Sequence, residues 1–296
     1  MPTEDISARF ADLDLWTTGD AVHAMVEDQL AAVAAVQSQA ARIVEAAEQA
    51  AIRLSGAEGR LIYVGAGTSG RIAVQDGVEL GPTFDWDRVA YLLAGGWDAL
   101  RSSVEGAEDD AEAADAAMRN LAPTSHDVVI GVAASGRTAY TLAAVRTAAA
   151  AGALTVGLAN NAGTPLLEAV DHPILLDTGA EVIGGSTRMK AGTAQKIALN
   201  LFSTAVMLRL GRADMGLMID MRLSNRKLRD RAVRIVARAA GVEDPVAADA
   251  LEKAGSNIKL AVLIAHGRSR DEGSALLRAA GGKLRAAIEQ AKSQQR

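Results

Sequence analysis

Short apolar runs alternate with helical periodicity along the middle of the chain, and this alternation restricts the fold more than any other feature. Five runs rich in Val, Ile and Leu are each bounded by Gly, Ser, Asp or Pro, as buried strands are. They are Leu61–Val64, Val89–Leu93, Val128–Val132, Leu154–Leu158 and Ile174–Leu176. Helical patterns separate most of them, at Arg71–Leu80, Ala107–Leu121 and Thr138–Ala151. The alternation predicts an α/β three-layer sandwich, with a mainly parallel five-stranded sheet covered by helices on both faces.

Helical segments flank this predicted core on both sides. An N-terminal helical arm is expected over roughly Ala21–Ser55, and a long helical pattern from about Met189 to Leu210 closes the core. After about Leu223, short helical patterns broken by glycines predict a small C-terminal helical bundle. The expected division is therefore an arm at 1–55, a central domain at 56–222 and a helical region at 223–296.

Composition excludes several classes of protein. The 296 residues contain no cysteine, which rules out disulfides and thiolate metal sites and fits a reducing cytoplasm. The acidic start has no apolar run, so we expect no secretory signal, and no stretch reaches the ~18 apolar residues of a membrane helix. A net charge of −5 gives no electrostatic footprint for nucleic acid.

The first candidate binding loop is Gly65–Arg71, "GAGTSGR". Its glycines let the backbone turn sharply off the first strand, and Thr68 and Ser69 stand where a helix begins. Hydroxyls and free N–H groups at a helix N-terminus form an anion site. The same residues also fit a plain capped helix start, and the GxGxxG spacing lacks the acidic residue of a dinucleotide site.

A second loop repeats this chemistry after the third run. In "AASGRT", Ala133–Thr138, the residues Ser135, Gly136 and Thr138 again combine hydroxyls with the start of a helix. Two such loops on adjacent parallel strands would converge at the carboxyl edge of the sheet, where ligands bind in this class of fold. The pair therefore predicts an anionic ligand better than either loop does alone.

A third segment, Glu181–Lys196, combines two glycines with hydroxyls and cations before the long helix. Ser186 and Thr187 could cap that helix, while Arg188 and Lys190 place positive charge in its first turn. Cations there oppose the helix dipole, so we expect an anion to be bound nearby.

Two groups of carboxylates are candidates for acid–base chemistry. Glu79 ends the first helical pattern before Gly81 and Pro82, and Glu105 and Glu108 are predicted to share one helical face. The second group could equally be the acidic first turn that the dipole favours. The four scattered histidines have no metal-ligand spacing, and no GxSxG elbow occurs, so Glu or Lys must do any proton transfer.

Taken together, these motifs resemble one family across nearly the whole chain. Segments 61–84, 104–110, 131–141, 184–211 and 216–236 are similar to the N-acetylmuramic acid 6-phosphate etherases, of the SIS (sugar isomerase) superfamily. The resemblance implies hydrolytic cleavage of the D-lactyl ether to N-acetylglucosamine 6-phosphate and D-lactate, in cytoplasmic recycling of cell-wall sugars. It also implies an SIS-type sandwich, no metal or organic cofactor, and a homodimer with sites near the subunit interface.

The family's chemistry assigns roles to these residues. It is an elimination in which the proton on carbon 2 is removed, lactate departs, and water then adds to the double bond. By resemblance Glu79 would protonate the lactyl oxygen, and Glu108, in preference to Glu105, would be the partner base. The SIS pattern puts the 6-phosphate on Thr68, Ser69, Ser135 and Thr138. Gly67 and Gly136 would bind substrate in the same loops, and the same cleft would be lined by Ser186, Thr187, Arg188 and Lys190. Leu80 and Gly81 depart from the Cys-Pro pair common in the family.

Two other functions share part of this pattern. A phosphosugar isomerase would need the phosphate loops but not both glutamates. A regulatory module that senses sugar phosphates is the other, but the chain has no helix-turn-helix head and no basic patch for DNA. The spacing from Thr68 to Glu79 spans ~16 Å if helical, so either the helix ends early and folds back at Gly77 or each site is shared between two subunits.

Overall fold

A five-stranded parallel sheet forms the centre of the computed structural model, which describes residues 1–56 and 58–293. Its order is β2-β1-β3-β4-β5, and every neighbouring pair is parallel. The strands are β1 (Leu61–Gly65), β2 (Val89–Leu93), β3 (Val128–Val132), β4 (Leu154–Ala159) and β5 (His172–Leu175). The predicted sheet is confirmed. The fifth strand begins two residues earlier than predicted, at His172, because Pro173 is tolerated on an edge strand.

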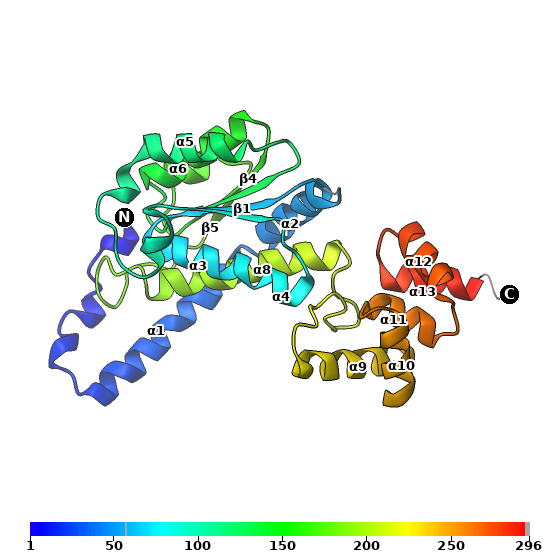
Figure 1. Cartoon of the computed structure of the whole chain (residues 1–296). Coiled ribbons are helices and arrows are strands. Elements are labelled where there is room, and N and C mark those ends of the chain that lie inside the picture. Colours follow the sequence, from blue (N-terminus) through cyan, green and yellow to red (C-terminus); the bar gives the residue numbers. More distant parts are fainter. Residues whose placement is uncertain (57, 294–296) are drawn as a thin grey trace. The chain divides into compact units, whose positions relative to one another are not determined.

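Helices cover both faces of the sheet (Figure 1). On one face lie α5 (Ala111–Leu121) and α6 (Ala139–Ala150), with the short α7 (Pro165–Glu168) against β4 and β5. On the other lie α2 (Ala40–Leu54), α3 (Gly67–Val78) and α8 (Lys190–Arg209). The three inner strands β1, β3 and β4 are buried at every position, which is why they read as continuous apolar runs.

Two predicted helices differ from the observed ones. The helix predicted at Arg71–Leu80 begins earlier, at Gly67, ends at Val78, and is followed by the separate α4 (Leu80–Phe84). The chain therefore does not fold back at Gly77, which lies inside α3 with no room for a Cβ beside Tyr91 and Tyr63.

The helix predicted at Ala107–Leu121 is interrupted at its start. Residues Ala107–Asp109 form a 3-10 turn after Gly106, whose φ of +75° is left-handed, and α5 begins at Ala111. The Asp110 carboxylate caps α5 by accepting the N–H of Ala113 at 2.8 Å. The expectation that Glu105 and Glu108 share a helical face is therefore wrong, because the left-handed glycine separates them.

Three 3-10 turns and a long helix make up the N-terminal segment. The turns are Pro2–Glu4, Ala8–Phe10 and Leu13–Leu15, and α1 follows at Thr18–Ser38. The helix α1 begins three residues before the predicted start at Ala21, because the hydroxyl of Thr17 caps it by accepting the N–H of Asp20 at 3.1 Å. A further 3-10 turn, Gly96–Leu100, follows β2.

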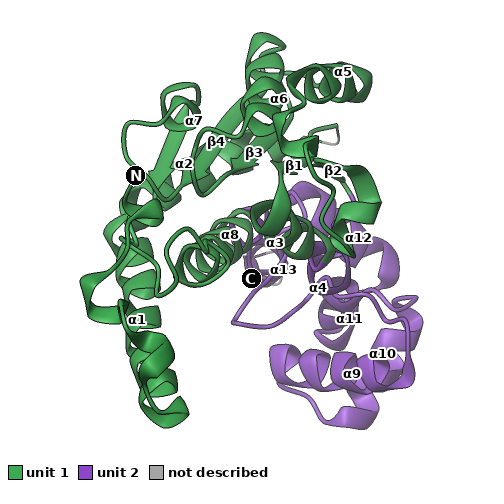
Figure 2. Cartoon of the chain, turned by 90° about the vertical axis from the view of Figure 1, so that its left-hand side faces the viewer, with its two compact units in different colours: residues 1–78, 88–206 green, residues 79–87, 207–296 purple. Residues whose placement is uncertain are grey.

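The chain divides into two compact units, coloured separately in Figure 2. Unit 1 comprises residues 1–78 and 88–206, and unit 2 comprises residues 79–87 and 207–296. Five helices of unit 2 pack into a small bundle with its own core; they are α9 (Arg226–Ala240), α10 (Asp244–Lys253), α11 (Ile258–Ala265), α12 (Arg270–Ala279) and α13 (Leu284–Ser293). The short α4 belongs to the same unit. The sequence-based division at 55/56 and 222/223 stays a prediction.

Unit 2 holds the α4 segment through polar contacts. The Arg222 Nε donates to Asp85 Oδ1 at 2.6 Å, and the Arg212 guanidinium lies 5.4 Å from the centre of the buried Trp86 ring. Arg212 also lies 3.6 Å from Asp220, whose carboxylate accepts a 2.6 Å hydrogen bond from Lys259 Nζ. These contacts fix the backbone immediately after Glu79.

Candidate active site

The first two predicted loops leave the sheet side by side. Gly65 at the end of β1 pairs with Val132 at the end of β3, so both loops start from the same edge. They border a cavity of about 350 Å³ within unit 1, a size that suits a small-molecule ligand. The side chains and backbone that line it are Glu4, Ala66, Gly67, Thr68, Ser69, Glu108, Asp109, Ala133, Ala134, Ser135, Arg137, Thr138 and Thr187.

The first loop depends on two glycines for close packing and on a third for its turn. A Cβ on Gly65 would lie 2.7 Å from the Gly70 Cα, so these residues let the start of α3 pack directly on β1. Gly67 has a φ of +53° and open space where a Cβ would be. The N–H of Gly70 makes the first helical bond, to Ala66, so the N–H groups of residues 67–69 precede the helical ladder and can bind a ligand.

The second loop is built in a similar way. Gly136 has a φ of +64°, and a Cβ there would lie 2.2 Å from the Thr164 hydroxyl oxygen. Ser135 Oγ accepts the N–H of Arg137 at 3.2 Å, and Thr138 is the N-cap of α6 without making a side-chain capping bond. The hydroxyls of Ser135 and Thr138 therefore line the cavity beside the N-terminus of a second helix.

Only one of the four residues predicted from the third segment lines the cavity. Thr187 does, whereas Ser186 and Arg188 are not among the lining residues. Lys190 is buried, and its Nζ donates to Asp28 Oδ1 of α1 at 2.7 Å. Lys190 was predicted to bind an anionic ligand, but its partner is the carboxylate of Asp28 in the protein itself.

The cap of α8 comes from a residue that the sequence analysis did not single out. Glu181 is fully buried, and its carboxylate accepts the N–H groups of Ala191 at 2.9 Å and Lys190 at 3.2 Å. Ser186 and Thr187 make no side-chain capping bond among those described; Thr187 accepts the Gly192 N–H through its carbonyl. Burial raises the pKa of Glu181, and the two backbone hydrogen bonds oppose that rise.

The structure separates the two candidates for the second glutamate. Glu108 and Asp109 line the cavity, and Glu105 is not among the lining residues. The Gly106 turn produces this arrangement, since it directs the 3-10 turn at 107–109 against α6. Glu79 directly follows α3 and belongs to unit 2, and it is not among the residues that line the cavity of unit 1.

Three charged residues that line the cavity were not predicted from the sequence. Glu4 lies far from the loops along the chain and no motif marked it, while Arg137 and Asp109 stand inside quoted motifs but were not selected. Charge could have found Arg137, because it is the one cation in the second loop. Within residues 1–56 and 58–293 no group of three or more His, Cys, Asp or Glu could hold a metal ion. No helix in the same ranges is both long and apolar enough to cross a membrane.

Two family models match overlapping parts of this chain. Residues 40–149 match the family model "Glucokinase regulatory protein N-terminal SIS domain", and residues 106–205 match "SIS domain". Among solved structures, phosphoheptose isomerase GmhA from Neisseria gonorrhoeae is similar at 17% identity, over 65% of this chain and 98% of that chain, with a TM-score of 0.48.

Full-length relatives are much more similar in sequence. An N-acetylmuramic acid 6-phosphate etherase of Deinococcus radiodurans is 50% identical, over 96% of this chain and 93% of the relative. One from Rubrobacter xylanophilus is 47% identical, over 97% of this chain and 96% of the relative. Identity at this level over nearly the full length of both chains shows that this chain belongs to the N-acetylmuramic acid 6-phosphate etherase family.

Proposed function

We propose that this chain cleaves the D-lactyl ether of N-acetylmuramic acid 6-phosphate, with water, to N-acetylglucosamine 6-phosphate and D-lactate. The observation that carries the proposal is the cavity at the first turns of α3 and α6, which is lined by the hydroxyl-bearing residues of both loops and by Glu108. Family membership supplies the substrate and the reaction. We expect the activity to serve cell-wall sugar recycling in the cytoplasm.

The 6-phosphate is best accommodated by the paired loops. Two helix N-termini point their positive dipole ends at one cavity, where Thr68, Ser69, Ser135 and Thr138 add hydroxyl donors. Arg137 contributes a cation at the same place. Gly67 and Gly136 shape the two turns, and we omit Lys190 from the phosphate site because Asp28 already neutralises it.

Phosphate bound at this place brings the sugar toward Glu108. Removal of the proton on carbon 2 requires a positioned base, and loss of lactate requires an acid at the ether oxygen. We assign the base to Glu108 because it lines the cavity, and we assign the acid to Glu79 by its place in the family motif. Water then adds to the resulting double bond, so neither step consumes a cofactor.

Glu79 is best explained as a residue of a shared site. Because α3 continues to Val78, about 16 Å of helix separates Thr68 from Glu79, too far for one small sugar to bridge along the helix. We therefore propose that Glu79 of the partner subunit completes each cleft in a homodimer. In support of a dimer, α1 exposes a stripe of apolar side chains at spacings of three and four; they are Val22 (47%), Val26 (63%), Leu30 (67%) and Val33 (54%).

The activity is tested with the substrate in heavy-oxygen water. We expect D-lactate together with N-acetylglucosamine 6-phosphate that carries the label, since water enters the sugar after elimination. If folded protein released no lactate, the proposed function would be wrong. Label found in lactate instead would contradict elimination but not cleavage.

Mixed dimers test whether the site is shared. Glu79→Gln and Glu108→Gln are each inactive in our proposal, but a dimer with one subunit of each kind contains one site with both glutamates intact. Random mixing after reversible dissociation should restore about a quarter of wild-type activity, since half of the dimers are mixed and each has one working site. No recovery in dimers shown to be mixed would place both glutamates in one subunit's site.

A further inference from the structure

We propose that Glu4 determines specificity at this site by accepting a hydrogen bond from an uncharged donor of the sugar, an O–H or the acetamido N–H. The inference rests on the proposed function. Glu4 belongs to the 3-10 turn Pro2–Glu4, in a segment that we call the N-terminal strap, Pro2–Ile6. It lines the same cavity as the two phosphate loops and Glu108.

The strap is anchored to two of the three loops around the cavity. Thr3 is fully buried, and its N–H and hydroxyl bond to the Asn161 side-chain amide at 3.3 and 2.9 Å. The same amide nitrogen of Asn161 donates to the carbonyl of Ala134 in the second loop at 2.9 Å. The Thr3 carbonyl accepts the N–H of Gly185 in the third segment at 3.0 Å. Glu4 is thereby held at a fixed place beside the cavity.

Two glycines make room for the strap. A Cβ on Gly185, whose φ is +77°, would lie 3.1 Å from a Glu4 carboxylate oxygen, and one on Gly184 would lie 3.4 Å from the Asp5 carbonyl oxygen. Side chains at these positions would press on the strap and displace the carboxylate. The Gly184–Gly185 pair therefore leaves the space that Glu4 and Asp5 occupy.

The chemistry of the substrate decides which part of it faces Glu4. An ionised carboxylate only accepts hydrogen bonds, so it cannot bind the phosphate or the lactyl carboxylate. The hydroxyls and the acetamido group of the amino sugar offer O–H and N–H donors. Glu4 would repel both anionic ends and attract the uncharged part between them, which fixes the direction of the sugar in the cleft.

Binding measurements with Glu4→Gln test this role without depending on turnover. The probes are N-acetylglucosamine 6-phosphate, glucose 6-phosphate and inorganic phosphate, measured by calorimetry on the full chain. We expect the variant to bind N-acetylglucosamine 6-phosphate about tenfold more weakly, because a charge-assisted hydrogen bond is lost. It should bind inorganic phosphate a few-fold more tightly, since a negative charge has left the cavity.

The sugar arms identify the donor. Weakening of N-acetylglucosamine 6-phosphate alone identifies the acetamido N–H, and equal weakening of glucose 6-phosphate identifies a hydroxyl. The matched control is Asp5→Asn, an exposed carboxylate of the same strap that is not among the cavity-lining residues, and it should change none of the three affinities.

Two results would overturn the inference. One is unchanged sugar-phosphate affinity in Glu4→Gln; the other is an equal loss of affinity for all three probes, which would reflect damage to the strap. If the wild-type protein itself bound no sugar phosphate, the proposed function would fail instead, so the two failures are distinguishable.

Discussion

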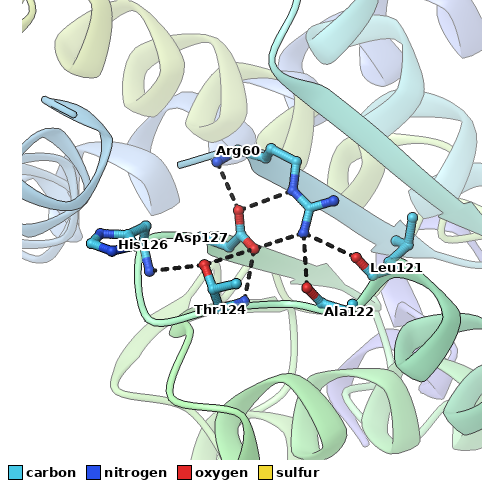
Figure 3. Close-up of polar contacts among 6 residues, drawn as sticks. All are labelled: Arg60, Leu121, Ala122, Thr124, His126 and Asp127. Carbon is cyan, nitrogen blue, oxygen red and sulfur yellow. Dashed lines mark hydrogen bonds and ion pairs between the residues drawn. The ribbon is translucent and has the colours of Figure 1, made fainter. Parts of the chain in front are cut away.

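The polar groups at the two edges of the parallel sheet differ in their partners: those at the amino edge bond to one another, and those at the carboxyl edge line a cavity. At the amino edge, Arg60 precedes β1 and Asp127 precedes β3, and their side chains satisfy each other (Figure 3). Asp127 accepts from the Arg60 N–H at 2.8 Å, from its Nε at 3.1 Å and from the Thr124 N–H at 2.8 Å. The Arg60 guanidinium also donates to the Leu121 carbonyl at 3.0 Å, so the cluster is internally complete.

At the carboxyl edge, the same two strands end in loops whose donors face a cavity. The N–H groups of the first turn of α3 and the hydroxyls of Ser135 and Thr138 line that space. Polar groups that find partners inside the protein stabilise the fold, and those left open are available to a ligand. The pair β1 and β3 therefore carries a stabilising cluster at one end and a candidate binding site at the other. Substitutions at one end should change stability, and substitutions at the other should change binding or activity.

The largest expected effect is on activity at the carboxyl edge. Glu108→Gln should lower lactate release about a thousandfold, because a positioned base contributes on the order of 10²–10⁴ in rate. Its side chain is exposed in the cavity, so the melting temperature should not change. The control is Glu105→Gln, which should retain activity within about twofold. If Glu105→Gln lost as much activity as Glu108→Gln, the assignment of Glu108 as the base would be wrong.

The next largest effect is on stability at the amino edge. Asp127→Ala should lower the free energy of unfolding by about 3 kcal/mol, since it leaves the Arg60 guanidinium without its partner and two N–H groups without an acceptor. Turnover per folded molecule should stay the same. Chemical denaturation gives the loss, with Glu45→Ala of an exposed ion pair as a control that should cost less than about 0.5 kcal/mol. If Asp127→Ala lowered the free energy of unfolding no more than Glu45→Ala does, the amino-edge cluster would not stabilise the fold as proposed.

Two glycine substitutions at the carboxyl edge test whether backbone conformation alone or a steric clash as well requires glycine. Gly136→Ala should cost about 2 kcal/mol and weaken sugar-phosphate binding, because its Cβ would meet the Thr164 hydroxyl at 2.2 Å in a left-handed turn. Gly67→Ala has the same left-handed requirement at φ +53° but open space, so it should cost about 1 kcal/mol. Denaturation and calorimetry compare them, and an equal cost in both would show that the collision with Thr164 is relieved.

The smallest effect is a difference in pH dependence between two buried carboxylates. Burial raises the pKa of Asp127, but hydrogen bonds from Arg60 and Thr124 outweigh it and leave that pKa below its ordinary value. Its stabilisation is therefore present above pH ~3.9 and is lost as the pH falls further toward the folded-state pKa. For Glu181, where burial raises the pKa, the folded state is stabilised by protonation, so stability falls as the pH rises above ~4.3.

Denaturation of the matching variants at several pH values checks these signs. The stability difference between wild type and Asp127→Asn should shrink from pH 5 to pH 3. The difference between wild type and Glu181→Gln should grow from pH 7 to pH 4. If each variant's stability changed with pH in the same way as that of the wild type, neither carboxyl group would have a different pKa in the folded and unfolded chain.

Local pattern predicted the sheet well, because strands buried on both faces are continuous apolar runs and need no long-range information. Pattern also located the two loops that border the cavity, since glycines and hydroxyls directly after a parallel strand are typical of the edge where this class of fold binds ligands. Helix boundaries were less predictable. The Gly106 turn broke a helix that periodicity extended through it, and Glu181 capped α8 from nine residues before its first turn.

Charge alone gave a wrong assignment for Lys190 and no sign of Glu4. Lys190 looked like a ligand for an anion because its position opposes the helix dipole, but the opposing anion is Asp28 on α1, which is 162 residues away along the chain. Glu4 carried no local signal and reached the cavity only because Asn161 and Gly185 hold Thr3. Such pairings depend on which segments pack together, and no spacing in the sequence encodes them.

The sequence by itself determined the order of strands and helices, the glycine and hydroxyl loops, and the family of the chain. These are properties of neighbouring residues, where backbone conformation and side-chain period are set locally. Only the tertiary structure decided which polar groups remain open to a ligand. That choice follows from long-range packing, which buried Lys190 against Asp28 and brought Glu4 to the cavity.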